Sequence, residues 1–224
     1  MAFAFPTTRE QGGFQERRSL LETVLTSKQL LFAMAFWAVA SAMNALGSNF
    51  IQANFPDRLP VPDLLFQVLP YVPATQYLTD IANIVSIFLL IAYLSEKGTS
   101  RLRELPFAIT AFSFAYMLRG FLIILTPLGG PLGNVVNYGI TTIHQHGQFP
   151  SGHTLVVAMA YMLVNEEEAP ALKKWMLAMV VVEVVSLLLS HGHYSIDIAG
   201  GLLLSYFCYH ETIRYEERLI VKSD

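Results

Sequence analysis

The sequence has little charge and almost no cysteine. Only 14% of its 224 residues are charged, against about 25% in a typical soluble domain. Cys208 is the single cysteine, which excludes an internal disulfide. The formal net charge is −3 and not the positive charge typical of nucleic-acid-binding proteins, so no nucleic-acid partner is expected. No linker, repeat or low-complexity segment divides the chain, and 54% of it is hydrophobic. These features predict a single domain that lies in a lipid bilayer.

Six apolar stretches are predicted to cross the membrane, because a helix of about 20 apolar residues spans the hydrocarbon core. They are residues 29–56, 76–94, 105–126, 151–165, 173–190 and 194–210. The predicted fold class is therefore all-α, an integral membrane bundle of six transmembrane helices. Residues 127–148, rich in glycine and proline, are interpreted as a re-entrant or interfacial loop.

The chain is accordingly divided into a cytoplasmic tail over 1–28, a membrane domain over 29–212 and a second cytoplasmic tail over 213–224. Residues 15–29 alternate between charged and apolar positions. They could form an amphipathic helix on the membrane surface, or belong to a frayed tail.

Positive charge predicts which side of the membrane each loop occupies. Twelve of the 14 lysine and arginine residues lie in the tails and loops of one side. The opposite loops hold only Arg58, and Arg119 lies inside the third predicted helix. The positive-inside rule then places both termini in the cytoplasm. The fourth and sixth helices begin together at the extracytoplasmic face, which is periplasmic or lumenal.

Two short motifs stand at those two helix starts. The first is Pro150-Ser151-Gly152-His153, where the backbone N–H groups of a helix start favour a bound phosphate. The second is His193 with Asp197, four residues apart and hence on one helix face. His193 is the candidate nucleophile, oriented by Asp197. His153 would protonate the leaving oxygen and then act as base for the acceptor. Together the motifs predict a site for phosphoryl transfer.

These motifs resemble those of the type-2 phosphatidic acid phosphatases, integral membrane enzymes that cleave lipid phosphates. The resemblance implies a six-helix bundle, a phosphohistidine at His193, acid catalysis by His153 and no metal or other cofactor. Two features depart from that family. The chain has no Lys-x6-Arg-Pro string, and Ser186-Leu187 stands where the family carries Ser-Arg.

A narrower branch shares these departures: the sphingomyelin synthases and related lipid head-group transferases. Residues 59–63, Arg119 with Thr126-Pro127, and 191–194 followed by Asp197 resemble its motifs, and the similarity runs over roughly residues 58–205. This resemblance implies a membrane phospholipid as donor. The acceptor would be a lipid alcohol, diacylglycerol or ceramide, or else water. Pro150 is closer to the phosphatases, so a simple lipid phosphate phosphatase stays as the alternative function.

Five residues form the predicted substrate-binding set: Arg119, Ser151, Gly152, His191 and Tyr194. An arginine inside an apolar helix is normally paired or functional, and Arg119 is interpreted as a phosphate ligand, with snorkelling or an ion pair as the alternative. Asp63 and Asp80 could orient His153 or the acceptor hydroxyl. Glu183 could have a structural role or line a substrate cavity.

Two other classes of function are compatible with parts of the sequence. His144, His146, His153, His191 and His193 with Asp197 could hold a metal ion for a membrane hydrolase, but this leaves the Pro-Ser-Gly before His153 unexplained. Charges inside the membrane could also mark a small transporter, but no internal repeat is found. Neither a metal nor another cofactor is therefore expected.

Overall fold

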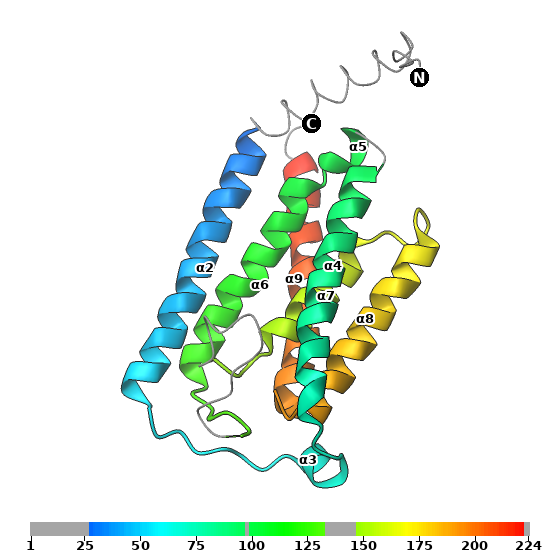
Figure 1. Ribbon diagram of the computed structural model, residues 1–224. Coiled ribbons are helices and arrows are strands. Elements are labelled where there is room, and N and C mark those ends of the chain that lie inside the picture. The colour runs from blue at the N-terminus through cyan, green and yellow to red at the C-terminus, as the bar shows by residue number, and fades with distance from the viewer. Residues whose placement is uncertain (1–26, 97–98, 133–146, 222–224) are drawn as a thin grey trace, which may run out of the picture.

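The computed structural model describes residues 27–96, 99–132 and 147–221, and these are helical with short connections and no strand. The helices, labelled in Figure 1, are α2 (Lys28–Asn54), α3 (Leu64–Val68), α4 (Gln76–Glu96), α5 (Thr99–Leu102), α6 (Leu105–Leu125), α7 (Gly152–Leu163), α8 (Pro170–Leu189) and α9 (Ser195–Val221). A 3-10 turn at Pro73–Thr75 precedes α4. The predicted all-α class is confirmed for the part of the chain described.

All six helices predicted from the apolar stretches are present as α2, α4, α6, α7, α8 and α9. Their bounds agree to within a few residues, except that α9 continues past His210 to Val221. Much of the predicted tail over 213–224 is therefore helical. Residues 15–26 of the predicted amphipathic segment lie outside the described residues, and so do His144 and His146.

Three helical segments in the described ranges are long and apolar enough to cross a membrane: Lys28–Asn54, Pro73–Glu96 and Leu105–Leu125. They indicate an integral membrane protein. The helix α7 has 12 residues, about 18 Å at 1.5 Å per residue, and α8 carries Lys173, Lys174 and Glu183. The six spans and the orientation of the termini stay predictions.

The helix α2 packs along α6 at very close range, and these two helices lie side by side in Figure 1. Two glycines permit this approach. A Cβ atom on Gly47 would lie 3.0 Å from the Gly120 carbonyl oxygen, and one on Gly120 would lie 3.1 Å from the backbone of Met43. Small residues allow membrane helices to bring their backbones together in this way.

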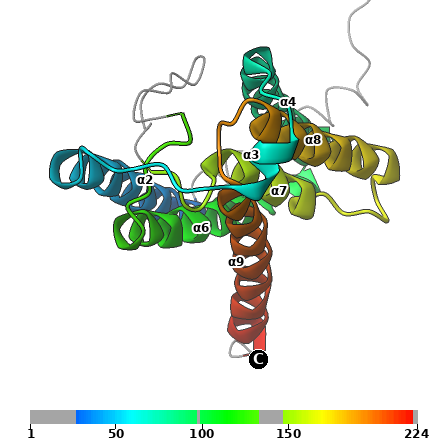
Figure 2. The ribbon, with the colours of Figure 1, turned by 90° about the horizontal axis from the view of Figure 1, so that it is seen from below.

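The short helix α7 lies at the centre of the bundle, where it contacts α4, α6, α8 and α9 (Figure 2). Its Leu155, Val157, Met159 and Ala160 have no exposed surface. Beyond its first turn, α7 is therefore enclosed by other helices, and its start faces the lower end of the bundle in Figure 1. The turn between α8 and α9 lies at the same end of the bundle, the lower end in Figure 1.

Candidate active site

A backbone hydrogen bond joins the two motifs directly. The Ser151 N–H donates to the Asp197 carbonyl oxygen at 2.9 Å, which ties the start of α7 to the first turn of α9. The Ser151 hydroxyl accepts from the Thr154 N–H at 3.2 Å and so caps α7. Serine is among the favoured residues at this position, because its oxygen satisfies an N–H that has no partner in the helix.

Two glycines of α9 make room for the first motif. A Cβ atom on Gly201 would lie 2.8 Å from the Ser151 carbonyl oxygen, and one on Gly200 would lie 2.7 Å from the Phe149 ring. This pair allows close contact between α9 and the first motif. Without it, α9 could not approach the loop that precedes His153.

His193 and Asp197 form the buried pair that their spacing predicts. The distance from His193 Nδ1 to Asp197 Oδ2 is 3.3 Å, and the same oxygen accepts from the Tyr194 N–H at 3.1 Å. Asp197 is fully buried, and His193 is 4% exposed. Burial lowers the pKa of His193 from its ordinary value, although the bond to Asp197 opposes the shift. The lowered pKa favours the neutral form of the imidazole.

His153 faces His193 across the site. The centroids of the two rings lie 6.0 Å apart, edge to face. On its other side, His153 Nε2 lies 3.8 Å from Asp80 Oδ1, which comes from α4. His153 is more open than His193, with 20% of its side chain exposed. The predicted meeting of the two histidines is thus found in the structure, and of the two aspartates considered for orienting His153, Asp80 is the one beside it.

Arg119 of α6 is buried beneath the first motif. Its Nε donates to the Pro150 carbonyl oxygen at 2.9 Å and its Nη2 to that of Gly147 at 2.9 Å. Its Nη1 donates to Asn44 Oδ1 of α2 at 2.8 Å. A Cβ atom on Gly152 would lie 3.1 Å from the guanidinium carbon, so the glycine leaves room for this group.

The contacts of Arg119 hold the loop that leads into α7. These bonds use three of the five N–H groups of a guanidinium. The predicted bond from Arg119 to a substrate phosphate stays a prediction. Asn44 was missed by sequence reasoning, although an asparagine in the middle of an uncharged membrane helix is itself a sign of an interhelical polar contact.

The other predicted binding residues lie close by but face protein groups. Tyr194 is 1% exposed, and its hydroxyl donates to the Gly129 carbonyl oxygen at 2.9 Å. The His191 ring stacks on Phe66 with 4.2 Å between centroids, and its backbone has a positive φ of 49°. Substrate contacts by these residues, and by the Gly152 N–H, stay predictions, whereas the Ser151 N–H is already bonded to the Asp197 carbonyl oxygen.

Glu183 lies deeper in the bundle, apart from the two motifs. It is fully buried on α8, and its Oε2 accepts from the Asn83 side chain of α4 at 2.9 Å. This bond joins α4 to α8, as a structural role requires. No group of three or more metal-ligating side chains is found among the described residues, which do not include His144 and His146.

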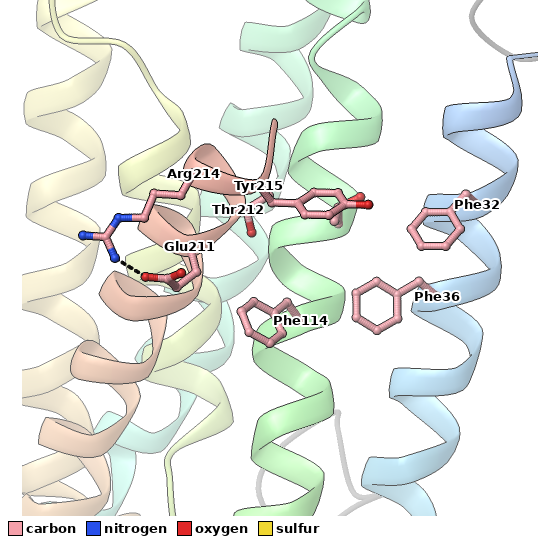
Figure 3. Close-up of a pocket in the computed structure, with 8 residues that line it drawn as sticks. Phe32, Phe36, Phe114, Glu211, Thr212, Arg214 and Tyr215 are labelled. Atoms are coloured by element: carbon pink, nitrogen blue, oxygen red, sulfur yellow. Dashed lines mark hydrogen bonds and ion pairs between the residues drawn. The ribbon is translucent and has the colours of Figure 1, made fainter. Parts of the chain in front are cut away.

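The apolar pocket in Figure 3 belongs to the opposite end of the bundle. It has a volume of about 300 Å³ and lies between α2, α6 and α9, lined by Phe32, Phe36, Phe114 and Tyr215 with Glu211, Thr212, Arg214 and Thr110. None of the predicted site residues lines it. It is therefore separate from the candidate active site.

Both motifs lie in a segment that matches a known protein family. Residues 149–213, which include both motifs, match the family model described as PAP2 superfamily C-terminal. The resemblance predicted from the motifs is confirmed. The phosphatidylcholine:ceramide cholinephosphotransferase 1 of Caenorhabditis elegans is 26% identical to this chain, in an alignment that covers 81% of it. The chain spans about half the length of that relative, of which 45% is aligned.

Proposed function

We propose that the protein is a membrane phosphotransferase that moves a phosphorylated head group from a phospholipid to a lipid alcohol. The observation that carries this proposal is the buried pair of His193 and Asp197, with His153 6.0 Å away between ring centroids. An oriented nucleophile, a second histidine for proton transfer and a helix start for the phosphate are together what the reaction requires.

In the first half-reaction, His193 Nε2 attacks the phosphorus of the donor lipid. A P–N bond forms and the P–O bond to the lipid alcohol breaks. The departing oxygen takes a proton from His153. Asp197 lies on the opposite ring nitrogen, Nδ1, at 3.3 Å, where its carboxylate stabilises the positive charge that develops on the imidazole.

In the second half-reaction, His153 takes the proton of the acceptor hydroxyl. The oxygen of that hydroxyl attacks phosphorus, the P–N bond breaks, and His193 returns to its neutral form. A second lipid alcohol as acceptor gives a head-group transferase, whereas water gives a hydrolase. Neither half-reaction requires a metal ion or another cofactor.

The similarity to a cholinephosphotransferase supports the transferase over a simple phosphatase, and suggests a phosphatidylcholine donor with a ceramide acceptor. The substitution of Leu187 for the arginine of the phosphatases points in the same direction. A phosphodiester carries less charge than a free phosphate ester and needs fewer cationic ligands. In this reading Arg119 and the N–H groups at the start of α7 bind the single charged phosphate.

We further propose that six helices cross the bilayer, with both termini in the cytoplasm and the site at the extracytoplasmic face. The described basic residues of the predicted cytoplasmic side support this orientation. Lys28, Arg103 and Lys173 stand at helix ends opposite to the turn that carries His193. Cysteines introduced into each loop and labelled from either side of a sealed vesicle test this orientation. Cys208 is buried and should stay unlabelled.

An assay with a labelled head group tests the function. The purified protein is incubated with labelled phosphatidylcholine, with and without ceramide or diacylglycerol, and the lipids are separated by thin-layer chromatography. His193→Ala is expected to abolish the product. His210→Ala, on the same helix but remote from the motifs, is the matched control and should leave the product unchanged.

Each outcome of this assay selects one function. A labelled lipid that forms only with acceptor, and survives excess chelator, establishes the transferase. Release of phosphate or phosphocholine without acceptor would instead make the protein a phosphatase or phospholipase C. Loss of all activity in chelator would replace the proposal with a metal-dependent hydrolase.

A further inference from the structure

The segment before α4 is hydrogen-bonded to the end of α8, just before the turn that carries His193. The Val72 N–H donates to the Leu189 carbonyl oxygen at 2.7 Å, and the Thr75 hydroxyl donates to that of Ser186 at 3.1 Å. Both acceptors lie in the last turn of α8. Figure 2 shows α3, which belongs to this segment, lying over the same end of the bundle. Residues distant in sequence thus brace the end of α8.

The start of α9 receives two carboxylates at its backbone N–H groups. Asp197 Oδ2 accepts from the Tyr194 N–H at 3.1 Å, which is the backward half of a capping box. Asp63 Oδ2 accepts from the Ser195 N–H at 2.6 Å. The first N–H groups of a helix have no acceptor within it. At α9, one of the two acceptors comes from more than 130 residues away in the chain.

Asp63 is itself held in place from its other side. Its Oδ1 accepts from the Leu65 N–H at 2.9 Å and caps α3. The Tyr194 hydroxyl adds a second link, because it accepts from the Val61 N–H at 3.1 Å and donates to the Gly129 carbonyl oxygen. The carboxylate of Asp63 therefore joins two helix starts, and only one of them carries the reacting groups.

We propose that Asp63 is a positioning residue for phosphoryl transfer. It fixes the first turn of α9, and this turn sets the direction from which Asp197 meets His193. The inference rests on the proposed function. Asp63 makes its contacts with backbone N–H groups, so it acts through the helix start rather than on the substrate. A displacement of about 1 Å in such a constellation costs on the order of 100-fold in rate.

The test compares three variants at equal amounts of folded protein. Asp63→Ala removes both acceptors. Asp63→Asn keeps one carbonyl oxygen in the same place. Asp57→Ala is the matched control, because Asp57 lies in the same connection, is exposed, and forms no hydrogen bond or ion pair with the described residues. The kcat and KM for head-group transfer are measured for each.

We expect Asp63→Ala to lower kcat about 10- to 100-fold with KM changed less than twofold. Asp63→Asn is expected to avoid most of that loss, with a kcat a few-fold below that of the wild type. Asp57→Ala should keep wild-type kcat. A wild-type kcat in folded Asp63→Ala would overturn the proposal. If that variant does not fold, Asp63→Asn decides in the same way, with a wild-type kcat as the contrary result.

Hydrogen exchange provides a readout that needs no substrate. In Asp63→Ala, or in Asp63→Asn if the alanine variant does not fold, the amides of residues 194–197 should exchange faster. They should exchange at the wild-type rate in Asp57→Ala. Unchanged exchange would overturn the proposed role of Asp63 even if the lipid assay failed. Conversely, an inactive wild-type protein with faster exchange in the Asp63 variant would refute the proposed function alone.

Discussion

Replacing Arg119 by methionine would remove the group that holds the loop before His153. The guanidinium makes three charge-assisted hydrogen bonds of 2.8–2.9 Å, and its side chain is almost fully buried. Methionine fills a similar volume but leaves three acceptors without donors. Each unpaired buried acceptor costs about 1–3 kcal/mol. Because the loop can relax, we expect a total loss of about 3–5 kcal/mol, near the lower end of the sum for three acceptors.

Unfolding in mixed micelles of a mild detergent and dodecyl sulfate measures this loss. Arg119→Lys keeps the charge and replaces one or two of the bonds, so about half the loss is expected. Arg103→Met is the matched control, because Arg103 is exposed at the start of α6. Exposed substitutions away from such networks change stability by about 0.5 kcal/mol or less.

The same variants separate two roles of Arg119 in catalysis. If the guanidinium chiefly shapes the loop, Arg119→Lys should lower stability and kcat together. The reasoning is refuted if Arg119→Met unfolds within 1 kcal/mol of wild type, taken as about the error of such a measurement, and differs only by a raised KM. That result would leave Arg119 with the role of a substrate ligand alone, because its bonds to Gly147 and Pro150 would add little to the fold.

Three further predictions follow from the site. Asp197→Asn should slow formation of the phosphoenzyme by about 10²–10⁴-fold, because the amide cannot stabilise the charged imidazole. Rapid quench with labelled donor measures this rate, and an unchanged rate would contradict the assigned role. Because burial lowers the pKa of His193, the nucleophile stays neutral to lower pH than an exposed histidine does. The acid limb of the pH profile of kcat/KM should therefore lie below the ordinary histidine pKa of about 6.5, and a limb at or above pH 7 would contradict this. Gly201→Ala should lower the free energy of unfolding by about 1–3 kcal/mol, because its Cβ would lie 2.8 Å from the Ser151 carbonyl oxygen, whereas exposed Ala199→Val should have little effect.

The sequence predicts the helices and the contact of His193 with Asp197 well, because both depend on local patterns. Uncharged runs of about 20 residues have few alternatives to a helix in a membrane. The four-residue spacing of His193 and Asp197 fixes their shared face wherever the helix lies.

The contacts that hold the site together were not predictable in the same way. The bonds from Arg119 to Asn44 and from Asp63 to Ser195 join residues 75 and 132 positions apart. Such pairs depend on which helices become neighbours, and no local pattern states that. A partial signal was present at Asp63, since an aspartate before an apolar run is typical of a helix cap. Its second oxygen, which reaches α9, had no signal in the sequence.

The bonds of Arg119 also bear on the order in which parts of the chain fold. The helices α2 and α6 pair through Gly47 and Gly120, and Arg119 bonds across that pair to Asn44. A ribosome completes these two helices before it reaches the loop of Gly147 and Pro150, and N-terminal parts of a chain generally fold first during synthesis. The guanidinium is thus already anchored on one side when the loop arrives. The helices α2 and α6, which are made first, thus provide the surface on which the loop before His153 takes its conformation.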